Sequence, residues 1–273
     1  MSDPRLTPAR PDLAAAYLRG KVEAARFAEG KIFTVTRGRA PLRGEPRSDA
    51  SLTTELLFGE AFTVYETREG WAWGQAQKDS YVGYLSADAL GDVGSATHRV
   101  TALMTPLLPA PDLKRIALDM LPLNAGVKIV SSEKNYARLA GGGFVTERHL
   151  APLDALAPDW TATAERFLGV PYIWGGKTQA GLDCSGLIQT ALAASGIVVP
   201  RDTDLIENFL THESKSPARG DLVFWKGHMG VMLDASRLLH ANAFHMQVAI
   251  EPLAEAIARI EKSAGPVTSV KRI

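Results

Sequence analysis

The sequence predicts an α+β protein in which two small strand-rich units precede a larger unit of helices and antiparallel strands. Three observations support this fold class. Short alternating segments separated by glycine turns recur between residues 29 and 154. A helical apolar stripe follows Cys184, the only cysteine. Four apolar runs between residues 221 and 250 then have the character of a strand meander.

The composition argues against several classes of protein. Thirty basic and thirty acidic residues cancel, whereas a nucleic-acid-binding protein usually carries a basic excess. We expect no membrane span, because no apolar run approaches the roughly 18 residues that one requires. A single cysteine allows no internal disulfide, which suits a reducing compartment. The opening residues Met1–Arg5 lack the apolar core of a secretion signal, so we expect a cytoplasmic protein.

The first half of the chain divides into three predicted parts. Residues 1–28 form a lead-in, with a helix expected from Pro11 to Glu29. Residues 29–94 and 95–154 form two small barrels. The first barrel has a turn-rich link at Ala40–Gly44, and strands are expected at Lys31–Val35, Ala61–Tyr65, Trp71–Ala76 and Tyr81–Leu85. Each barrel closes with a similar segment, which predicts two copies of one unit.

Residues 155–273 form the third predicted domain. A helix is expected at Trp160–Leu168 and a second at Ser185–Ser195, which Gly196 ends. Cys184 therefore lies at a helix N-terminus, where free amides and the helix dipole favour a thiolate nucleophile. The alternative is that Cys184 is a small buried hydrophobic residue.

Two histidines are candidates for the base that a cysteine nucleophile needs. If Asp234–Ser236 is a three-residue hairpin loop, Gly230 faces His240, and His228 lies diagonally within reach of His240. Each histidine alone could instead have a structural role. A zinc site formed by Cys184 and the two histidines is the competing functional interpretation, but no close ligand pair supports it, so we expect no metal and no other cofactor.

Six blocks of sequence then occur in a familiar order: Tyr172–Gly176, Leu182–Leu187, Pro200–Thr203, Arg219–Trp225, Gly227–Val231 and Leu239–Ala243. Together they closely resemble the NlpC/p60-type cysteine peptidases, which have a minimal papain-like core. The preceding units resemble bacterial SH3-like domains, the first more clearly than the second. The whole chain resembles a γ-D-glutamyl-L-diamino acid endopeptidase of the kind that recycles murein peptides.

The resemblance implies a role for several residues. Cys184 is the expected nucleophile, His228 the base and His240 the residue that orients it. Tyr172 would help to hold the oxyanion. Further residues would bind substrate: Asp183, Ser185 and Thr203 in the catalytic domain, and Tyr81 and Glu55 (with Glu60 as the rival acid) in the first barrel.

The resemblance also implies a substrate, the free tripeptide L-Ala-γ-D-Glu-diaminopimelate, with its amino terminus bound by Asp183. Three other functions stay open: an autolysin acting on intact wall, another thiol acyl-transfer enzyme, and a non-catalytic wall-binding protein. Thr203 stands where the family commonly has serine, and Ile206 where it often has glutamine, so details of the pocket differ. The oligomeric state and the preferred diamino acid are not indicated by the sequence.

Overall fold

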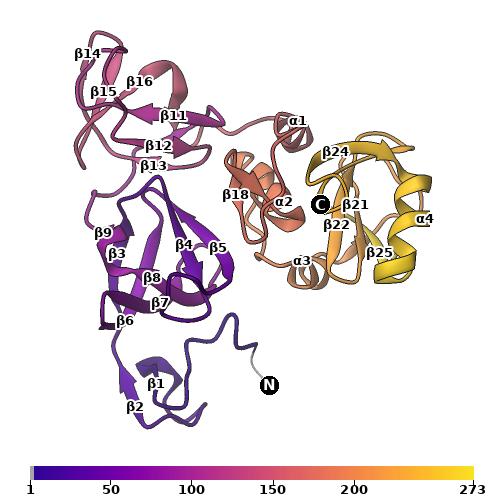
Figure 1. Ribbon diagram of the computed structural model, residues 1–273, viewed down its shortest axis with the longest axis horizontal. Coiled ribbons are helices and arrows are strands. Elements are labelled where there is room, and N and C mark those ends of the chain that lie inside the picture. The colour runs from indigo at the N-terminus through magenta and orange to yellow at the C-terminus, as the bar shows by residue number, and fades with distance from the viewer. Residues whose placement is uncertain (1–2) are drawn as a thin grey trace. The chain divides into compact units, whose positions relative to one another are not determined.

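A computed structural model describes residues 3–273. The chain divides into two compact units, which meet in sequence between Ala155 and Leu156, beside the expected boundary at 155 (Figure 1). In the part of the chain that the structure describes, no helix has both the length and the apolar character needed to cross a bilayer.

The expected helix near the N-terminus is wrong. Strands β1 (Leu13–Ala15) and β2 (Arg26–Ala28) pair in parallel instead, and only a short 3-10 turn, Ala16–Leu18, lies between them. Three consecutive residues of β1 are buried, which one face of a helix could not achieve. Pairing with β2 therefore decides the local conformation.

One seven-stranded sheet forms the first barrel, in the order β5-β4-β8-β7-β6-β3-β9. The strands are β3 (Lys31–Val35), β4 (Arg39–Arg43), β5 (Leu52–Leu57), β6 (Ala61–Arg68), β7 (Trp71–Ala76), β8 (Val82–Ser86) and β9 (Leu90–Gly91). The link expected at Ala40–Gly44 is wrong, because β4 is a strand paired with β5. Ala40 and Leu42 alternate into the barrel core, and this burial outweighs the turn character of the sequence.

Three small sheets surround a second core in the same unit. They contain β10 (His98–Val100), β11 (Met104–Leu107), β12 (Asp119–Pro122), β13 (Gly126–Val127), β14 (Ile129–Glu133), β15 (Tyr136–Leu139), β16 (Phe144–Thr146) and β17 (Leu150–Pro152). In each half of the unit, a strand, a 3-10 turn and a short strand follow one another at the end: Ala87–Ala89 and Glu147–His149 are the two turns. The similar closing sequences therefore form similar structures.

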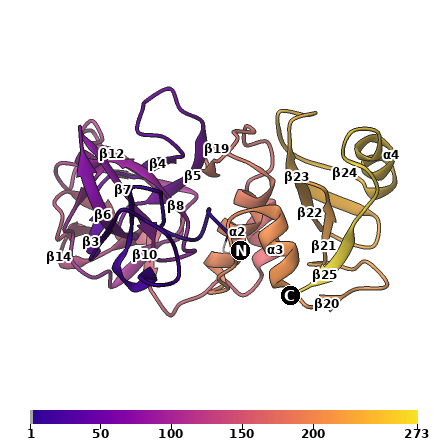
Figure 2. The same cartoon turned by 90° about the horizontal axis from the view of Figure 1, so that it is seen from below.

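The second unit is built on a six-stranded antiparallel sheet of order β20-β25-β21-β22-β23-β24. Its strands are β20 (His212–Glu213), β21 (Leu222–Trp225), β22 (His228–Met232), β23 (Arg237–Asn242), β24 (Gln247–Pro252) and β25 (Ser269–Arg272). The four-strand meander from β21 to β24 is confirmed. Figures 1 and 2 both show the sheet between helices α2 (Cys184–Ala194) and α4 (Leu253–Ala264).

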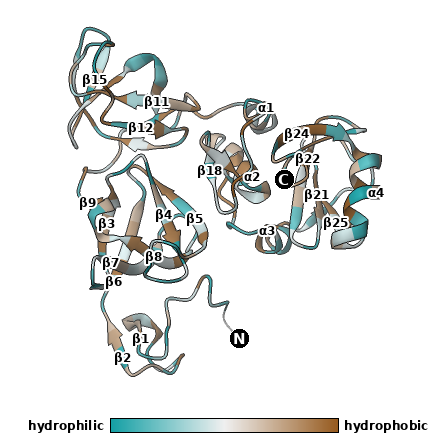
Figure 3. Cartoon of the chain, viewed as in Figure 1, coloured by the Kyte–Doolittle hydropathy of each residue, from teal (hydrophilic) through white to brown (hydrophobic). Residues whose placement is uncertain are grey.

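Helix α2 is buried along most of its length, and Figure 3 colours it mainly as hydrophobic. It packs against β22 and β23, and it ends before Gly196, whose positive φ matches the expected helix stop. Helix α1 (Trp160–Glu165) is shorter than predicted. Helices α3 (Thr203–Phe209) and α4 and the short pair β18 (Lys177–Thr178) and β19 (Gly181–Leu182) were not anticipated from the sequence.

Candidate active site

Cys184 is the first residue of α2, and the side chain of Asp183 caps this helix. Asp183 Oδ1 accepts a hydrogen bond of 2.7 Å from the Gly186 amide. Gly186 has to be glycine for a steric reason: a Cβ there would stand 2.1 Å from the carbonyl oxygen of Gly176. The cap and this close approach fix the position of the cysteine at the end of the helix.

The charge of Asp183 is already balanced inside the protein. Arg201 Nη2 donates to Asp183 Oδ2 at 2.7 Å, and Nη1 donates to Oδ1 at 2.9 Å, while the Gly175 amide also donates to Oδ2. Arg201 is only 1% exposed. Asp183 therefore already has a buried cationic partner, and its predicted contact with a substrate amine stays a prediction.

The thiol of Cys184 is protonated at neutral pH in this structure. Burial raises its pKa from 9.0 to about 11, and the neighbouring Asp183 carboxylate adds to the rise. The Thr203 hydroxyl, 3.6 Å from Sγ, and the Met229 amide act in the opposite direction but are weaker. The expected lowering of the thiol pKa at the helix start is wrong, because burial is the largest influence on this group.

The histidine pair has the predicted register. Val231 pairs with Leu239 and Met232 with Leu238, and Leu233 N donates to the Arg237 carbonyl, as a three-residue loop requires. His228 Nε2 lies 2.8 Å from His240 Nδ1. The diagonal approach of the two rings is therefore confirmed. Their roles as base and orienting residue stay predictions.

Both rings are neutral at neutral pH, because burial lowers the pKa of His228 to about 4 and that of His240 to about 2. His240 is fully buried and its Nε2 lies 2.6 Å from Glu251 Oε1. Glu251 also accepts a hydrogen bond from Arg259 of α4. Sequence reasoning missed Arg201, Glu251 and Arg259. The sequence signal that could have pointed to Glu251 is the position of this acid directly after the apolar residues Val248–Ile250.

Three other predicted residues lie around the thiol in the second unit. Tyr172 is half-buried; burial, followed by the proximity of Cys184, raises the pKa of its phenol, so it is a neutral donor at pH 7. The Thr203 hydroxyl faces Sγ. Ser185 instead accepts a hydrogen bond of 2.8 Å from Arg201 and belongs to the buried Asp183 network. Ile206, which stands where the family often has glutamine, is fully buried.

The two candidates in the first barrel are buried there. Tyr81 is 6% exposed and belongs to the barrel core, while Glu55 is 1% exposed and pairs with Arg39 at 2.8 Å. The rival acid Glu60 accepts from Lys78 at 3.0 Å. Substrate binding by Tyr81 and Glu55 stays a prediction, and their burial favours a structural role for both side chains.

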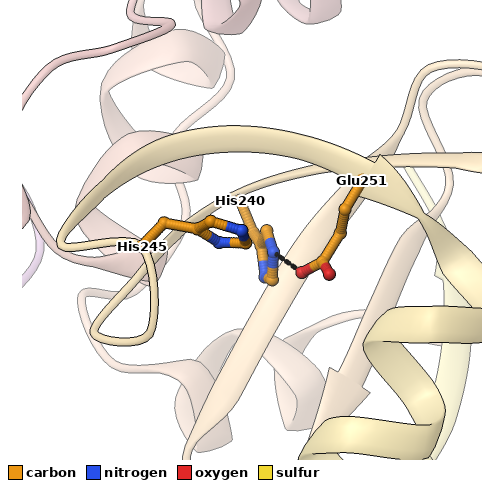
Figure 4. A group of neighbouring side chains, drawn as sticks. All are labelled: His240, His245 and Glu251. Atoms are coloured by element: carbon orange, nitrogen blue, oxygen red, sulfur yellow. Dashed lines mark hydrogen bonds and ion pairs between the residues drawn. The ribbon is translucent and has the colours of Figure 1, made fainter.

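A group with the spacing of metal ligands is formed by His240, His245 and Glu251 (Figure 4). Each ring nitrogen of His240 already has a hydrogen-bond partner, and the Arg259 guanidinium contacts the same carboxylate oxygen. A cation would have to displace these contacts and would stand beside a positive charge. The group therefore fits a hydrogen-bonded relay better than a metal site.

Together the residues of the second unit can activate a thiol by general base catalysis. A neutral imidazole can accept the proton of a neutral thiol as the sulfur attacks a carbonyl. Among residues 3–273, the structure gives no hydrogen bond between Sγ and the His228 ring. Such contacts commonly form only when substrate is bound.

The raised thiol pKa has a measurable consequence for alkylation. We expect iodoacetamide to modify Cys184 more slowly at pH 7 than it modifies a free thiol, and the rate to rise as pH approaches about 11, because only the thiolate reacts. Mass spectrometry at a series of pH values measures this at the only cysteine. A plateau already present near neutral pH, as a thiolate–imidazolium pair would give, contradicts the prediction.

Two segments match known domain families. Residues 42–90 match the bacterial dipeptidyl-peptidase SH3 domain, and residues 169–261 match the NlpC/P60 family. The second segment contains Cys184, both histidines and Glu251. The family resemblance inferred from the sequence is therefore confirmed, with the SH3-like match on the first barrel.

Relatives and solved structures agree with these matches. Dipeptidyl-peptidase 6 of Lysinibacillus sphaericus is 27% identical over 79% of this chain and 89% of its own length. The γ-D-glutamyl-L-lysine dipeptidyl-peptidase of Bacillus subtilis is 26% identical over 77% of this chain and 79% of its own. The crystal structure of an NlpC/P60 family protein from Bacillus cereus aligns with a TM-score of 0.75 at 19% identity, covering 89% of this chain and 99% of that one, which shows a common fold.

Proposed function

Because this chain is a cysteine peptidase that joins an SH3-like domain to a papain-like NlpC/P60 domain, we propose that it hydrolyses peptides derived from peptidoglycan. The observation that carries the proposal is the arrangement in the second unit: the only thiol of the chain at the start of α2, packed against the strand that begins with His228, whose ring contacts His240. Two relatives that align over 74% and 77% of this chain are named as γ-D-glutamyl-L-lysine dipeptidyl-peptidases.

The reaction follows from these groups. His228 accepts the thiol proton as Sγ of Cys184 attacks the scissile carbonyl, and the Tyr172 hydroxyl donates to the oxyanion that forms. The tetrahedral intermediate collapses, the C–N bond breaks, and the leaving amine takes the proton from His228. Water, deprotonated by the same ring, then cleaves the thioester and regenerates the thiol.

We further propose that the substrate is a free murein peptide, L-Ala-γ-D-Glu-diaminopimelate, which the enzyme cuts after D-Glu in the cytoplasm during recycling. Support comes from the names of two relatives, which are γ-D-glutamyl-L-lysine dipeptidyl-peptidases. The competing proposal is an autolysin with the same chemistry that acts on intact wall, where L-Ala is joined to muramic acid.

Blocking the substrate amine tests this choice. We expect kcat/KM to be on the order of a hundredfold higher for free L-Ala-γ-D-Glu-diaminopimelate than for its N-acetyl form, because acetylation removes the ammonium charge, and a hydrogen bond to a charged group contributes about 1.5–3 kcal/mol. Cleavage of the lysine-containing tripeptide and of purified sacculi is measured in the same assay. Equal cleavage of free and blocked peptides, together with digestion of sacculi, would replace the recycling proposal with the autolysin.

A further inference from the structure

A carboxylate lies behind the histidine pair, on the side of His240 away from His228. Glu251 is on β24, where its register partner across β23 is Leu238, while Ala249 pairs with His240. The two residues are thus diagonal neighbours on one face of the sheet. Figure 4 shows the His240 ring directed at this carboxylate, with the dashed line from Nε2 to Oε1, a distance of 2.6 Å.

The protons in this chain of contacts can be assigned in order. An ionised carboxylate only accepts hydrogen bonds, so the proton between Glu251 and His240 is on Nε2 of His240. The ring of His240 is neutral, which leaves its Nδ1 as an acceptor. His228 must then donate from Nε2 across the 2.8 Å contact. In the neutral His228 ring, Nδ1 is consequently the nitrogen without a proton.

We infer that Glu251 is a positioning residue for the cysteine peptidase reaction: through His240 it fixes the tautomer of His228 so that Nδ1 is the nitrogen that accepts the thiol proton. The inference rests on the function proposed above and extends it by one residue. If Glu251 did not accept from His240 Nε2, the proton of His240 could move to Nδ1, which would then donate to His228 Nε2. The proton of His228 would in that case be on Nδ1, the nitrogen that has to accept the thiol proton.

Arg259 holds the carboxylate in place and limits its charge. It donates to Oε1 from α4, and its guanidinium stacks over the Phe244 ring with 4.3 Å to the ring centroid. The charged and titratable groups around Glu251 are Arg259, His240 and His245, with His228 beyond His240. Glu251 favours an extra proton on the ring pair, whereas Arg259 opposes it and helps to lower the pKa of both histidines.

Substitution of each charged group separates this role from a structural one. We expect Glu251→Gln to lower kcat/KM roughly 10- to 100-fold through kcat, because general base catalysis contributes about 10²–10⁴. The acid limb of its pH profile should move to lower pH. Arg259→Met should move the acid limb to higher pH, since it removes the opposing charge. Glu261→Gln, on the exposed side of the same helix, is the matched control and should change neither.

NMR of the imidazole nitrogens of the full chain without substrate gives a second readout. Protonated Nε2 and unprotonated Nδ1 on both rings support the inference, and so does loss of that pattern in Glu251→Gln at an unchanged melting temperature. Wild-type activity and pH profile in Glu251→Gln would overturn it, as would activity lost only in proportion to stability, or the opposite tautomer in the wild type. The spectra need no turnover, so they stay decisive even if the proposed substrate is wrong.

Discussion

Replacement of Cys184 by alanine should abolish turnover and leave the fold intact. The thiol is the only one in the chain, and it lies beside the Thr203 hydroxyl at the start of α2. Removing a nucleophile commonly lowers kcat by about 10⁴-fold or more. The side chain is small, so we expect a change in unfolding free energy of only about 1 kcal/mol. Peptide release measured by chromatography, together with thermal melting, tests both parts.

Ser195→Ala is the matched control for this substitution. Ser195 follows the last residue of the same helix, and its hydroxyl has no hydrogen-bond partner among residues 3–273. This variant should keep wild-type activity. Full activity in Cys184→Ala would exclude a covalent thiol mechanism, and unfolding of that variant would favour the view of Cys184 as a packed core residue.

Replacement of Arg201 by methionine should have the largest effect on stability. Arg201 and Asp183 form a buried ion pair, with side chains 1% and 11% exposed. Loss of one partner leaves the other charge uncompensated, which costs roughly 3–5 kcal/mol. Because Asp183 also caps α2, the start of the helix that carries Cys184 should loosen. Urea unfolding followed by tryptophan fluorescence measures the change, with buried Trp225 as a reporter in the same unit.

An exposed pair in the same unit provides the control. Arg219 contacts Asp159 at 3.0 Å, with side chains 41% and 46% exposed, so Arg219→Met should cost less than about 1 kcal/mol. The double variant Asp183→Asn with Arg201→Met should lose less than the sum of the two single variants, since neither charge is then left alone. Additive losses, or a small loss in Arg201→Met, would mean that the buried pair contributes little.

Local sequence patterns were sufficient to predict much of the secondary structure and strand register of the second unit. The stripe after Cys184 predicted α2, and its end at Gly196 is confirmed. The loop length at Asp234–Ser236 predicted which residues of β22 and β23 face each other. Both predictions depend on neighbours along the chain, where periodicity and turn geometry are specific.

The elements whose secondary structure was predicted wrongly are those that pair or pack with segments distant in sequence. The segment Pro11–Glu29 was predicted as a helix, but within it the backbone of Leu13–Ala15 pairs with that of Arg26–Ala28. The turn-like sequence at Ala40–Gly44 becomes a strand because Ala40 and Leu42 fill the barrel core. In both cases burial and long-range pairing outweigh weak local preferences.

The sequence alone determined the family, the candidate nucleophile, the histidine candidates and the strand register that brings the two rings together. Tertiary structure decided the electrostatics. Arg201 is 18 residues from Asp183 yet neutralises it, and Glu251 reaches His240 from the next strand. Burial makes the Cys184 thiol neutral where a helix terminus alone predicted a thiolate. Charge and protonation depend on the solvent and on the partners around each group, and these are set only when distant segments pack together.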